Sequence, residues 1–306
     1  MPANAVIELR DVDIVKGSDV LVRRLSTDIV AGRVLAFVSQ HSEATIALGN
    51  VLCGVTTGYG IEGDLVLDGR ELVSRVGGQE KTQAELCVAR GEPAPESRDT
   101  IRDVVRTALA VGRRDDIGAT LTALLGQVAL PDAIADTRLS DLSAADRLRV
   151  GFATALAKRP QVIVVDLPYI PDASTLYATH SELLHDLSRR IPVAWVITTD
   201  SLAVAADVAD DVVLLLDGRV VEQGSVYDVC LRPAMPYTKD LLLVTPRPHR
   251  ALPDYPAFVD LAAHDGCPWV LNCREPLLPE CAHTVPTLRI VGPGHDAACH
   301  RLQRHG

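Results

Sequence analysis

Short apolar runs bounded by turn residues dominate the first part of the chain. Residues 5–10, 20–30 and 33–38 have the composition of strands, and residues 61–72 have the pattern of a hairpin around an Asp-Gly turn. Together these segments predict a small antiparallel β unit near the start of the chain.

The pattern becomes helical and more polar from about residue 80 to residue 141. Within this range, residues 100–111 and 117–128 have the periodicity of amphipathic helices, and they follow the chain breaks at Pro93 and Pro95. We therefore predict a helical subdomain inserted at about residues 80–141.

Apolar strands alternate with helices in the next part of the chain. Helices are predicted at 144–157, 173–190 and 202–208, strands at 162–165 and 193–198, and a second Asp-Gly hairpin at 212–224. Uninterrupted apolar strands between helices are typical of a parallel sheet covered on both faces, which predicts an α/β fold. Proline becomes frequent beyond residue 244, so we predict a core at 1–244 and a C-terminal extension at 245–306.

The composition is that of a globular protein with one large core and an appendage, because 47% of the 306 residues are hydrophobic. No apolar run approaches the roughly 18 to 20 residues that cross a bilayer, and the first residues lack the charge and apolar block of a signal peptide. The chain is therefore expected to stay in the cytoplasm. Its net charge of −10 argues against nucleic acid as a partner, but it leaves a membrane-protein partner open.

Residues 34–55 combine a buried strand, a tight loop and a helix, which is the setting of a phosphate-binding P-loop. Such a loop needs G-x-x-x-x-G-K-[ST], because its backbone amides and lysine hold phosphates and its hydroxyl holds magnesium. The corresponding positions here are Ser39, Ser42, Glu43, Ala44, Thr45 and Ile46. No lysine lies between Lys16 and Lys81, and Lys81-Thr82 does not follow a glycine turn. The sequence thus predicts a degenerate P-loop.

In this order, the segments resemble an ABC-transporter ATP-binding subunit of the oligopeptide/dipeptide (peptide/nickel) importer branch. The resemblance covers residues 7–299 and rests on the P-loop frame, DLSAADRLRVGFATALAKRPQVIVVDLP at 141–168, the strand and hairpin at 193–224, and Pro-Tyr-Thr at 236–238 with the following cysteines. It implies the ABC-ATPase nucleotide-binding-domain fold, which is a P-loop NTPase core with an antiparallel β subdomain, an inserted helical subdomain and a cysteine-bearing extension.

The positions that hydrolyse ATP in this family are altered in this chain. The Walker B aspartate is kept as Asp166, but Leu167 replaces the glutamate that would polarise water, and Thr199 replaces the switch histidine. The glutamine loop reads Ala-Arg-Gly-Glu at 89–92, and residues 12–25 contain no aromatic residue to stack on adenine. We interpret Asp166 as a residual loop-ordering carboxylate rather than a magnesium ligand.

The family's signature motif, which faces the partner subunit's nucleotide, reads Leu142-Ser143-Ala144-Ala145-Asp146 in this chain. The serine is kept, whereas two alanines replace the glycines that allow close approach to the γ-phosphate. Through this motif the chain would still serve a partner's ATP site.

Four of the seven cysteines, Cys267, Cys273, Cys281 and Cys299, are grouped in the C-terminal extension. Thiols stay reduced in a cytosolic protein, so metal ligation is favoured over disulfides, and four thiolates suit tetrahedral zinc or a four-iron, four-sulfur (4Fe-4S) cluster. The family resemblance favours the 4Fe-4S cluster as a structural staple, with zinc and an unmetallated tail as alternatives. His295 and His300 are interpreted as second-shell or solvated groups, and the remaining cysteines Cys53, Cys87 and Cys230 as inert core thiols.

The resemblance implies a catalytically degenerate subunit that pairs head to tail with an active ABC ATPase and binds two transmembrane permease subunits through about residues 92–111. An extracytoplasmic substrate-binding protein would take part indirectly. The chain would lie peripherally on the cytoplasmic face of the plasma membrane, with ATP and magnesium not expected in its own P-loop but expected at the interface with its partner. Two alternatives remain at this point, an iron-sulfur sensor that reuses the fold and an atypical active ATPase. The sequence does not distinguish peptide from nickel or heme cargo.

Overall fold

The protein is built around one large sheet, in the order β5-β4-β1-β2-β10-β9-β3-β8-β7-β6, with β12 and β11 attached beside β10. The computed structural model describes residues 5–40, 42–67, 69–71, 88–91, 94–111, 117–167, 174–244 and 265–304. The strands are β1 (Ala5–Lys16), β2 (Asp19–Val30), β3 (Val34–Ser39), β4 (Gly60–Leu67), β5 (Arg70–Glu71), β6 (Val88–Arg90), β7 (Val162–Asp166), β8 (Ala194–Thr199), β9 (Asp211–Leu216), β10 (Arg219–Ser225), β11 (Arg289–Gly292) and β12 (His295–Ala297). The α-helices are α1 (Ser42–Leu52), α3 (Ile101–Val111), α4 (Ile117–Gln127), α5 (Ala144–Ala157), α6 (Ser174–Arg190), α7 (Leu202–Val208), α8 (Val226–Leu231), α9 (Pro236–Val244) and α10 (Glu280–His283).

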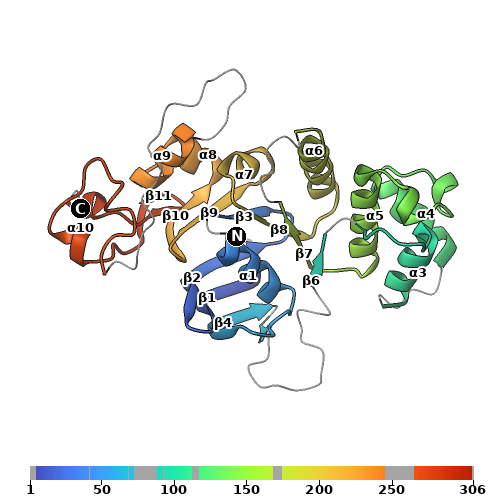
Figure 1. The fold of residues 1–306 in the computed structure, drawn as a ribbon, viewed down its shortest axis with the longest axis horizontal. Helices are drawn as coiled ribbons and strands as arrows, with labels where there is room; N and C mark the ends of the chain where they lie inside the picture. Colours follow the sequence, from blue (N-terminus) through green and yellow to red (C-terminus); the bar gives the residue numbers. More distant parts are fainter. Residues whose placement is uncertain are drawn as a thin grey trace.

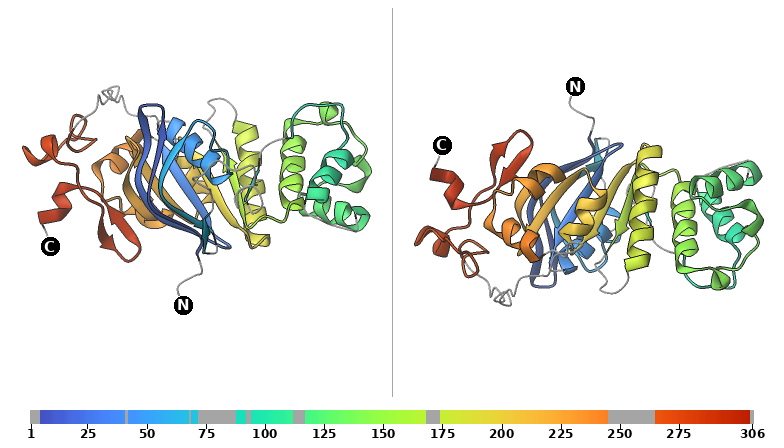
Figure 2. Two further views of the ribbon diagram at one scale, coloured as in Figure 1. Left: turned by 90° about the horizontal axis from the view of Figure 1, so that it is seen from below. Right: turned by 90° about the horizontal axis from the view of Figure 1, so that it is seen from above.

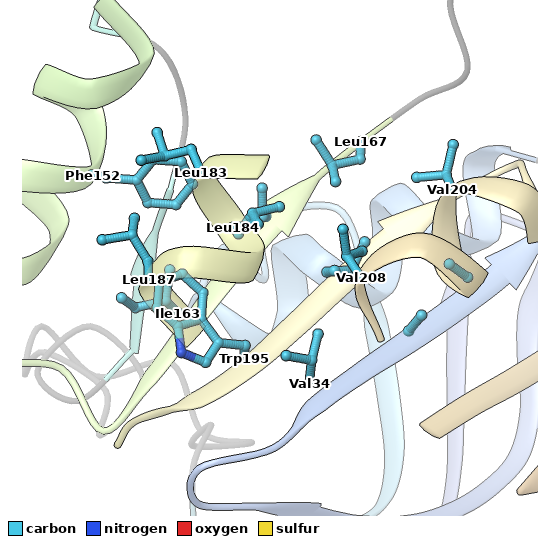
Figure 3. Close-up of a cluster of buried hydrophobic side chains, with 14 of the residues drawn as sticks. Val34, Phe152, Ile163, Leu167, Leu183, Leu184, Leu187, Trp195, Val204 and Val208 are labelled. Carbon is cyan, nitrogen blue, oxygen red and sulfur yellow. The ribbon is translucent and has the colours of Figure 1, made fainter. Parts of the chain in front are cut away.

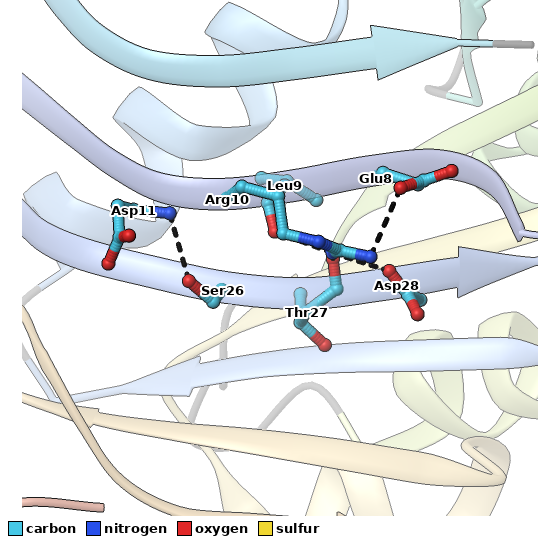
Figure 4. Close-up of polar contacts among 7 residues, drawn as sticks. All are labelled: Glu8, Leu9, Arg10, Asp11, Ser26, Thr27 and Asp28. Carbon is cyan, nitrogen blue, oxygen red and sulfur yellow. Dashed lines mark hydrogen bonds and ion pairs between the residues drawn. The ribbon is translucent and has the colours of Figure 1, made fainter. Parts of the chain in front are cut away.

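Of the segments predicted to form an antiparallel unit, three do so, as β1, β2 and β4. The prediction was wrong for residues 33–38, because β3 pairs in parallel with β8 and β9. β1 continues to Lys16, beyond the predicted end at residue 10, because the alternation of buried side chains resumes at Val12 and Ile14, shifted by one residue from that of Ile7 and Leu9. The pairing of β1 with β2 is irregular near Asp11, whose backbone N–H donates to Ser26 Oγ at 2.9 Å (Figure 4). Nearby, Arg10 pairs with Glu8 and Asp28 on the surface of the same two strands (Figure 4).

A parallel core follows, in which β3 lies between β8 and β9, and β7 continues the sheet on the far side of β8. All six residues of β3 and all six of β8 are buried, as expected for strands covered on both faces. α1 and the antiparallel unit pack on one face, and α6 and α7 lie on the other (Figure 1). The prediction of a parallel sheet covered on both faces is confirmed.

The cluster on the second face is apolar throughout. Trp195 on β8 is fully buried beside Phe152 of α5, with ring centroids 6.0 Å apart. Leu184 and Leu187 of α6 complete this cluster (Figure 3). Packing of this kind involves only apolar side chains, so it does not restrict which residues stand in the loops at the ends of the strands.

The helical subdomain lies at one end of the molecule, away from the antiparallel unit (Figures 1 and 2). α3 and α4 confirm the helices predicted at 100–111 and 117–128, and α3 buries Ile101, Val105 and Leu109 against its neighbours. One part of the predicted helical range is wrong, because β6 pairs in parallel with β7 as an edge strand of the core sheet. A strand of three residues is too short to show a period of two in the sequence.

The C-terminal part, residues 265–304, joins the core sheet. β12 pairs with β10 through Glu222 and Ala297, and β11 pairs with β12 as a hairpin. This hairpin was absent from the sequence prediction, which found no periodic pattern beyond residue 244. Among the helices in the described residues, none is both long and apolar enough to cross a membrane.

Candidate functional site

The segment predicted to be a degenerate P-loop joins the end of β3 to the start of α1. Helix α1 already begins at Ser42, so only two residues separate it from Ser39, the last residue of β3. Ser39 is fully buried, and Ala44 and Thr45, at the glycine and lysine positions of the motif, are 3% and 2% exposed. Ile46, at the magnesium-binding position, is 42% exposed. Neither Thr45, at the lysine position, nor Ile46, at the magnesium-binding position, therefore presents a group that would bind phosphate or magnesium.

Electrostatics at the start of α1 oppose a bound phosphate as well. The N-terminus of a helix carries partial positive charge that favours an anion. Here Glu43 lies in the first turn of α1 and supplies that negative charge from the chain itself. A carboxylate at this position competes with a phosphate for the same amides.

Asp166, the residual Walker B carboxylate, ends β7 and is hydrogen-bonded within the protein. Its Oδ1 accepts from Thr198 Oγ1 on β8 at 3.0 Å. Desolvation raises the pKa of Asp166, while the Thr198 hydroxyl and the charge of Arg90 lower it in part. The structure thus brings together a carboxylate, a hydroxyl and a guanidinium at the ends of neighbouring strands.

Arg90 is a component of this site that the sequence analysis did not single out. It ends β6, and its Nη2 donates to Asn50 Oδ1 on α1 at 2.8 Å. Asn50 Nδ2 in turn donates to Tyr59 Oη at 3.2 Å. Because Arg90 lowers the pKa of Asp166, it acts as an internal counter-charge near the position where a nucleotide-bound cation would lie. No sequence signal identified Arg90, because its position depends on the pairing of the short β6.

Leu167 and Thr199, at the two positions predicted to have lost their catalytic residues, make contacts within the fold. Leu167 is 5% exposed and lies in the apolar cluster with Leu184 and Val204 (Figure 3). Thr199 is 1% exposed, and its Oγ1 accepts from the backbone N–H of Ser201 at 3.1 Å, where α7 is about to begin. Neither side chain is placed to polarise water.

The signature segment forms the N-terminus of α5. Ser143 is the N-cap residue, and its hydroxyl accepts from the Asp146 N–H at 3.1 Å and donates to Asp146 Oδ2 at 2.8 Å. Ser143 and Ala144 are exposed, Ala145 is half-buried, and Leu142 packs against the core. The motif is therefore presented on the surface, although Asp146 holds the serine hydroxyl.

The four cysteines of the extension lie near one another around α10. Cys267 N donates to Cys281 O at 2.8 Å, and Cys281 Sγ accepts from Leu277 N at 3.3 Å. Burial raises the pKa of the Cys267 thiol to about 11, and the charges of the other three thiols add to that rise. Backbone N–H groups next to Cys267, Cys273 and Cys299 hydrogen-bond their sulfurs and lower each pKa in part.

These thiols have the chemistry of a metal-ligand set, but their positions are not those of a metal site. Amides that donate to sulfur favour thiolates, which are the form that binds zinc or iron. Within the part of the chain that the structure describes, no group of three or more His, Cys, Asp or Glu side chains stands in a metal-binding arrangement. The convergence therefore fits the donor chemistry of the predicted site, whereas the sulfur positions do not form a coordination shell.

His295 and His300 of the extension are buried, so the option of solvated groups was wrong for these two. His295 is 6% exposed and its Nε2 lies 2.7 Å from Glu222 Oε1, while His300 is 7% exposed and its Nε2 lies 2.8 Å from Thr284 O. Each ring has a polar partner that compensates its burial. Of the three other cysteines, Cys53 and Cys230 are half-buried thiols, and Cys87 lies outside the described residues with Lys81, Thr82 and Glu92.

Sequence comparison relates the chain to transport proteins. It is 28% identical over 297 residues to a protein of Brucella ovis named as a peptide import ATP-binding protein, with 92% of each chain covered. It is 25% identical over 325 residues to the oligopeptide transport ATP-binding protein OppD of Salmonella typhimurium, covering 97% of this chain and 94% of OppD. No family model matches the chain. The resemblance stated from the motifs is confirmed by these relatives.

Structural comparison gives the same fold. The chain superposes on cbiO1 of Clostridium perfringens, part of the ABC transporter complex cbiONQ, with a TM-score of 0.65 and 16% identity, covering 78% of this chain and 96% of cbiO1. A nucleotide-free ATP-binding cassette from an ABC transporter gives a TM-score of 0.62 at 16% identity, covering 78% and 98%. The predicted ABC-ATPase fold is confirmed.

Proposed function

Because the chain has the fold of an ABC ATPase nucleotide-binding domain and resembles peptide-import ATP-binding proteins over almost its whole length, we propose that it is the ATP-binding-type subunit of an ABC peptide importer. In this role it lies on the cytoplasmic face of the membrane and binds permease subunits through the region of α3. Peptide is the proposed cargo because two relatives are named for peptide import and oligopeptide transport.

We further propose that this subunit does not hydrolyse ATP itself. The observation that carries this proposal is the state of the P-loop, where Thr45 is buried at the lysine position and Glu43 occupies the first turn of α1. Leu167, packed in the apolar cluster, supports it from the opposite side of the site. A phosphate here would meet a carboxylate and no lysine, and an attacking water would have no base.

The proposed contribution of the chain is to a partner's site. Ser143 and Ala144 are exposed at the N-terminus of α5, where unpaired backbone amides attract phosphate. The partner would be a second ABC ATPase that keeps its own P-loop lysine, forming a heterodimer. Domain closure around ATP at that site would then move the permeases.

A matched pair of serines tests this contribution. Ser143 caps α5 and Ser225 caps α8, and each accepts from the N–H of an aspartate three residues on and donates to its carboxylate. Ser143→Ala and Ser225→Ala should each cost about 1 kcal/mol of stability. In the assembled importer, only Ser143→Ala should lower ATP turnover, by roughly tenfold or more, as for loss of one transition-state donor. Equal turnover in the two variants would contradict the proposal.

A second pair of variants tests which of the two subunits hydrolyses ATP. Replacing the P-loop lysine of the partner with alanine should abolish turnover in the complex. Thr45→Lys in this chain should add none, because Leu167 and Thr199 remain. Turnover by this chain alone, or its gain in the Thr45→Lys variant, would favour an atypical active ATPase.

For the four cysteines we propose a structural 4Fe-4S cluster, with zinc as the alternative. The supporting observations are the convergence of the four thiols and the backbone N–H groups that donate to them. When bound, the metal would cross-link a segment that has little apolar core of its own. Iron, zinc and acid-labile sulfide measured after anaerobic purification distinguish the two, and Cys230→Ser is the control for Cys267→Ser. Metal retained in full by Cys267→Ser would exclude this ligand set.

A further inference from the structure

A polar pocket lies between β2, β10 and the segment 285–288 of the extension. Its volume is about 450 Å³. The polar residues that line it are Asp11, Arg23, Arg24, Ser26, Arg219 and Thr287. Three arginines against one aspartate give the lining a formal charge of +2, in a chain whose net charge is −10.

The strand pairing places two of these arginines side by side. Arg219 of β10 and Arg23 of β2 are direct partners where the two strands run parallel, and the Arg23 N–H donates to Gly218 O at 2.7 Å. Residue 218 has φ of +70°, and a Cβ there would lie 2.6 Å from Leu21 O. Glycine therefore permits the close approach of the two strands that brings the arginines together.

A local distortion adds the third arginine. Successive side chains of a regular strand point to opposite faces, yet Arg23 and Arg24 both line the pocket. Arg24 has φ of +47°, a left-handed conformation that is uncommon for residues other than glycine. Its N–H donates to Asp13 Oδ1 at 2.7 Å, which holds this conformation.

The guanidinium groups are poorly compensated within the described residues. Neither Arg23 nor Arg219 forms an ion pair there, and the buried Nε of Arg23 has no hydrogen-bond partner. Arg24 lies 3.5 Å from Asp11 Oδ1, and both side chains are largely exposed. Burial lowers the pKa of Arg219, the charge of Arg23 lowers it further, and Asp217 and Asp13 oppose the change. Buried donors without acceptors and like charges in contact are both unfavourable unless an anion completes them.

We propose that this pocket binds a phosphate-bearing anion, held by Arg23, Arg24 and Arg219. Guanidinium groups donate in pairs to phosphate oxygens, and the free Nε–H of Arg23 supplies a donor already oriented by the fold. The volume exceeds that of a phosphate ion, so a phosphate ester of a small molecule or of a lipid headgroup also fits. This site is separate from the P-loop, and it does not depend on the function proposed above.

The test is calorimetric titration of the full chain with inorganic phosphate and with pyrophosphate in a chloride buffer. Saturable binding that weakens as salt concentration rises is expected. Arg219→Gln should weaken it by about tenfold or more, as for loss of one charged hydrogen-bonding partner. Arg10→Gln is the matched control, because Arg10 lies on the neighbouring strand but already pairs with Glu8 and Asp28. It should leave the affinity unchanged.

Stability measurements separate loss of the site from loss of the fold. Without phosphate, Arg219→Gln should be at least as stable as the parent chain, because it removes a repelled charge. Phosphate should raise the melting temperature of the parent and of Arg10→Gln, but not that of Arg219→Gln. Absence of saturable binding both to free phosphate and to phosphatidylcholine vesicles that contain phosphatidic acid, or equal binding by both variants, would overturn the proposal. Binding to phosphatidylcholine vesicles that contain phosphatidic acid, with no binding of free phosphate, would assign the site to a lipid headgroup.

Discussion

Glu222 is a buried residue whose replacement should weaken the attachment of the extension to the core. It is fully buried on β10, and its carboxylate accepts from Ala234 N at 2.7 Å, from Met235 N at 3.1 Å and from the ring of His295 at 2.7 Å. The first two donors lie just before α9 and the third lies on β12. One side chain thus ties β10, α9 and the extension together.

The expected cost of Glu222→Gln follows from these contacts. A hydrogen bond to a charged group contributes about 1.5–3 kcal/mol, and a buried donor left unsatisfied costs about 1–3 kcal/mol. Glutamine keeps one acceptor oxygen but turns an NH₂ group toward a backbone N–H or the imidazole. We therefore expect a loss of about 2–4 kcal/mol in the free energy of unfolding.

Urea unfolding measures the global effect, and amide hydrogen exchange locates it. Exchange should accelerate first at Ala298, whose N–H donates to Val221 O where the extension meets the core. Asp296→Asn on the paired strand β12 is the control, because Asp296 Oδ2 accepts only a partly buried bond from Gln223 Nε2, and asparagine keeps an acceptor. The control should cost under about 1 kcal/mol. Equal losses in the two variants, or an unchanged exchange pattern in Glu222→Gln, would refute this account.

Three further variants test other parts of the structure. Asp166→Asn should raise the melting temperature at neutral pH, because desolvation raises the pKa of Asp166 in the folded state and its ionised form therefore disfavours folding; the gain should shrink as the pH falls into the range where the parent carboxyl is protonated in both the folded and the unfolded chain. A gain that persists undiminished in acid would contradict this. Leu167→Glu should cost about 3 kcal/mol or more in urea unfolding, because a carboxylate enters the cluster around Leu184, so a Glu variant as stable as the parent would show that the site is open. Gly63→Ala should cost about 2–4 kcal/mol, because φ is +88° and a Cβ would lie 2.3 Å from Asp11 O. The control, Gly126→Ala at an exposed position of α4, should stabilise by up to about 1 kcal/mol, and equal melting temperatures of the two variants would refute the strain expected at residue 63.

The regular elements were predictable because each is long enough to show its hydrophobic pattern in the sequence. β3, β8 and β9 are strands of six residues in which most side chains are apolar, and α3 carries a clear buried face. β6 and the β11–β12 hairpin were not predictable in the same way, because strands of three or four residues owe their existence to the neighbours they pair with. The extension has almost no periodicity of its own, yet β10 provides the edge that orders it.

The candidate site shows the same division between local and long-range information. The absence of a P-loop lysine could be read from the sequence, since it depends on residue identity alone. Arg90 could not, because its contacts with Asn50 and its effect on Asp166 require β6, α1 and β7 to be placed together. The Ser143 to Asp146 bond was equally unexpected, although the S-x-x-D spacing at a helix start is a capping signal.

The apolar core and the loops at the strand ends are separate, which explains how this fold could form without the ATP-site residues that we propose it lacks. The buried faces of β3, β7 and β8 are satisfied by apolar packing alone, so no core residue depends on a bound nucleotide. At the strand ends, the residues at the predicted ATP-site positions make contacts within the fold: Leu167 fills the apolar cluster, Thr199 bonds the backbone before α7, and Arg90 compensates Asp166. A reversion at one position would therefore have to break a contact that now stabilises the fold. This is why single substitutions toward the active motif should lower stability before they restore any chemistry.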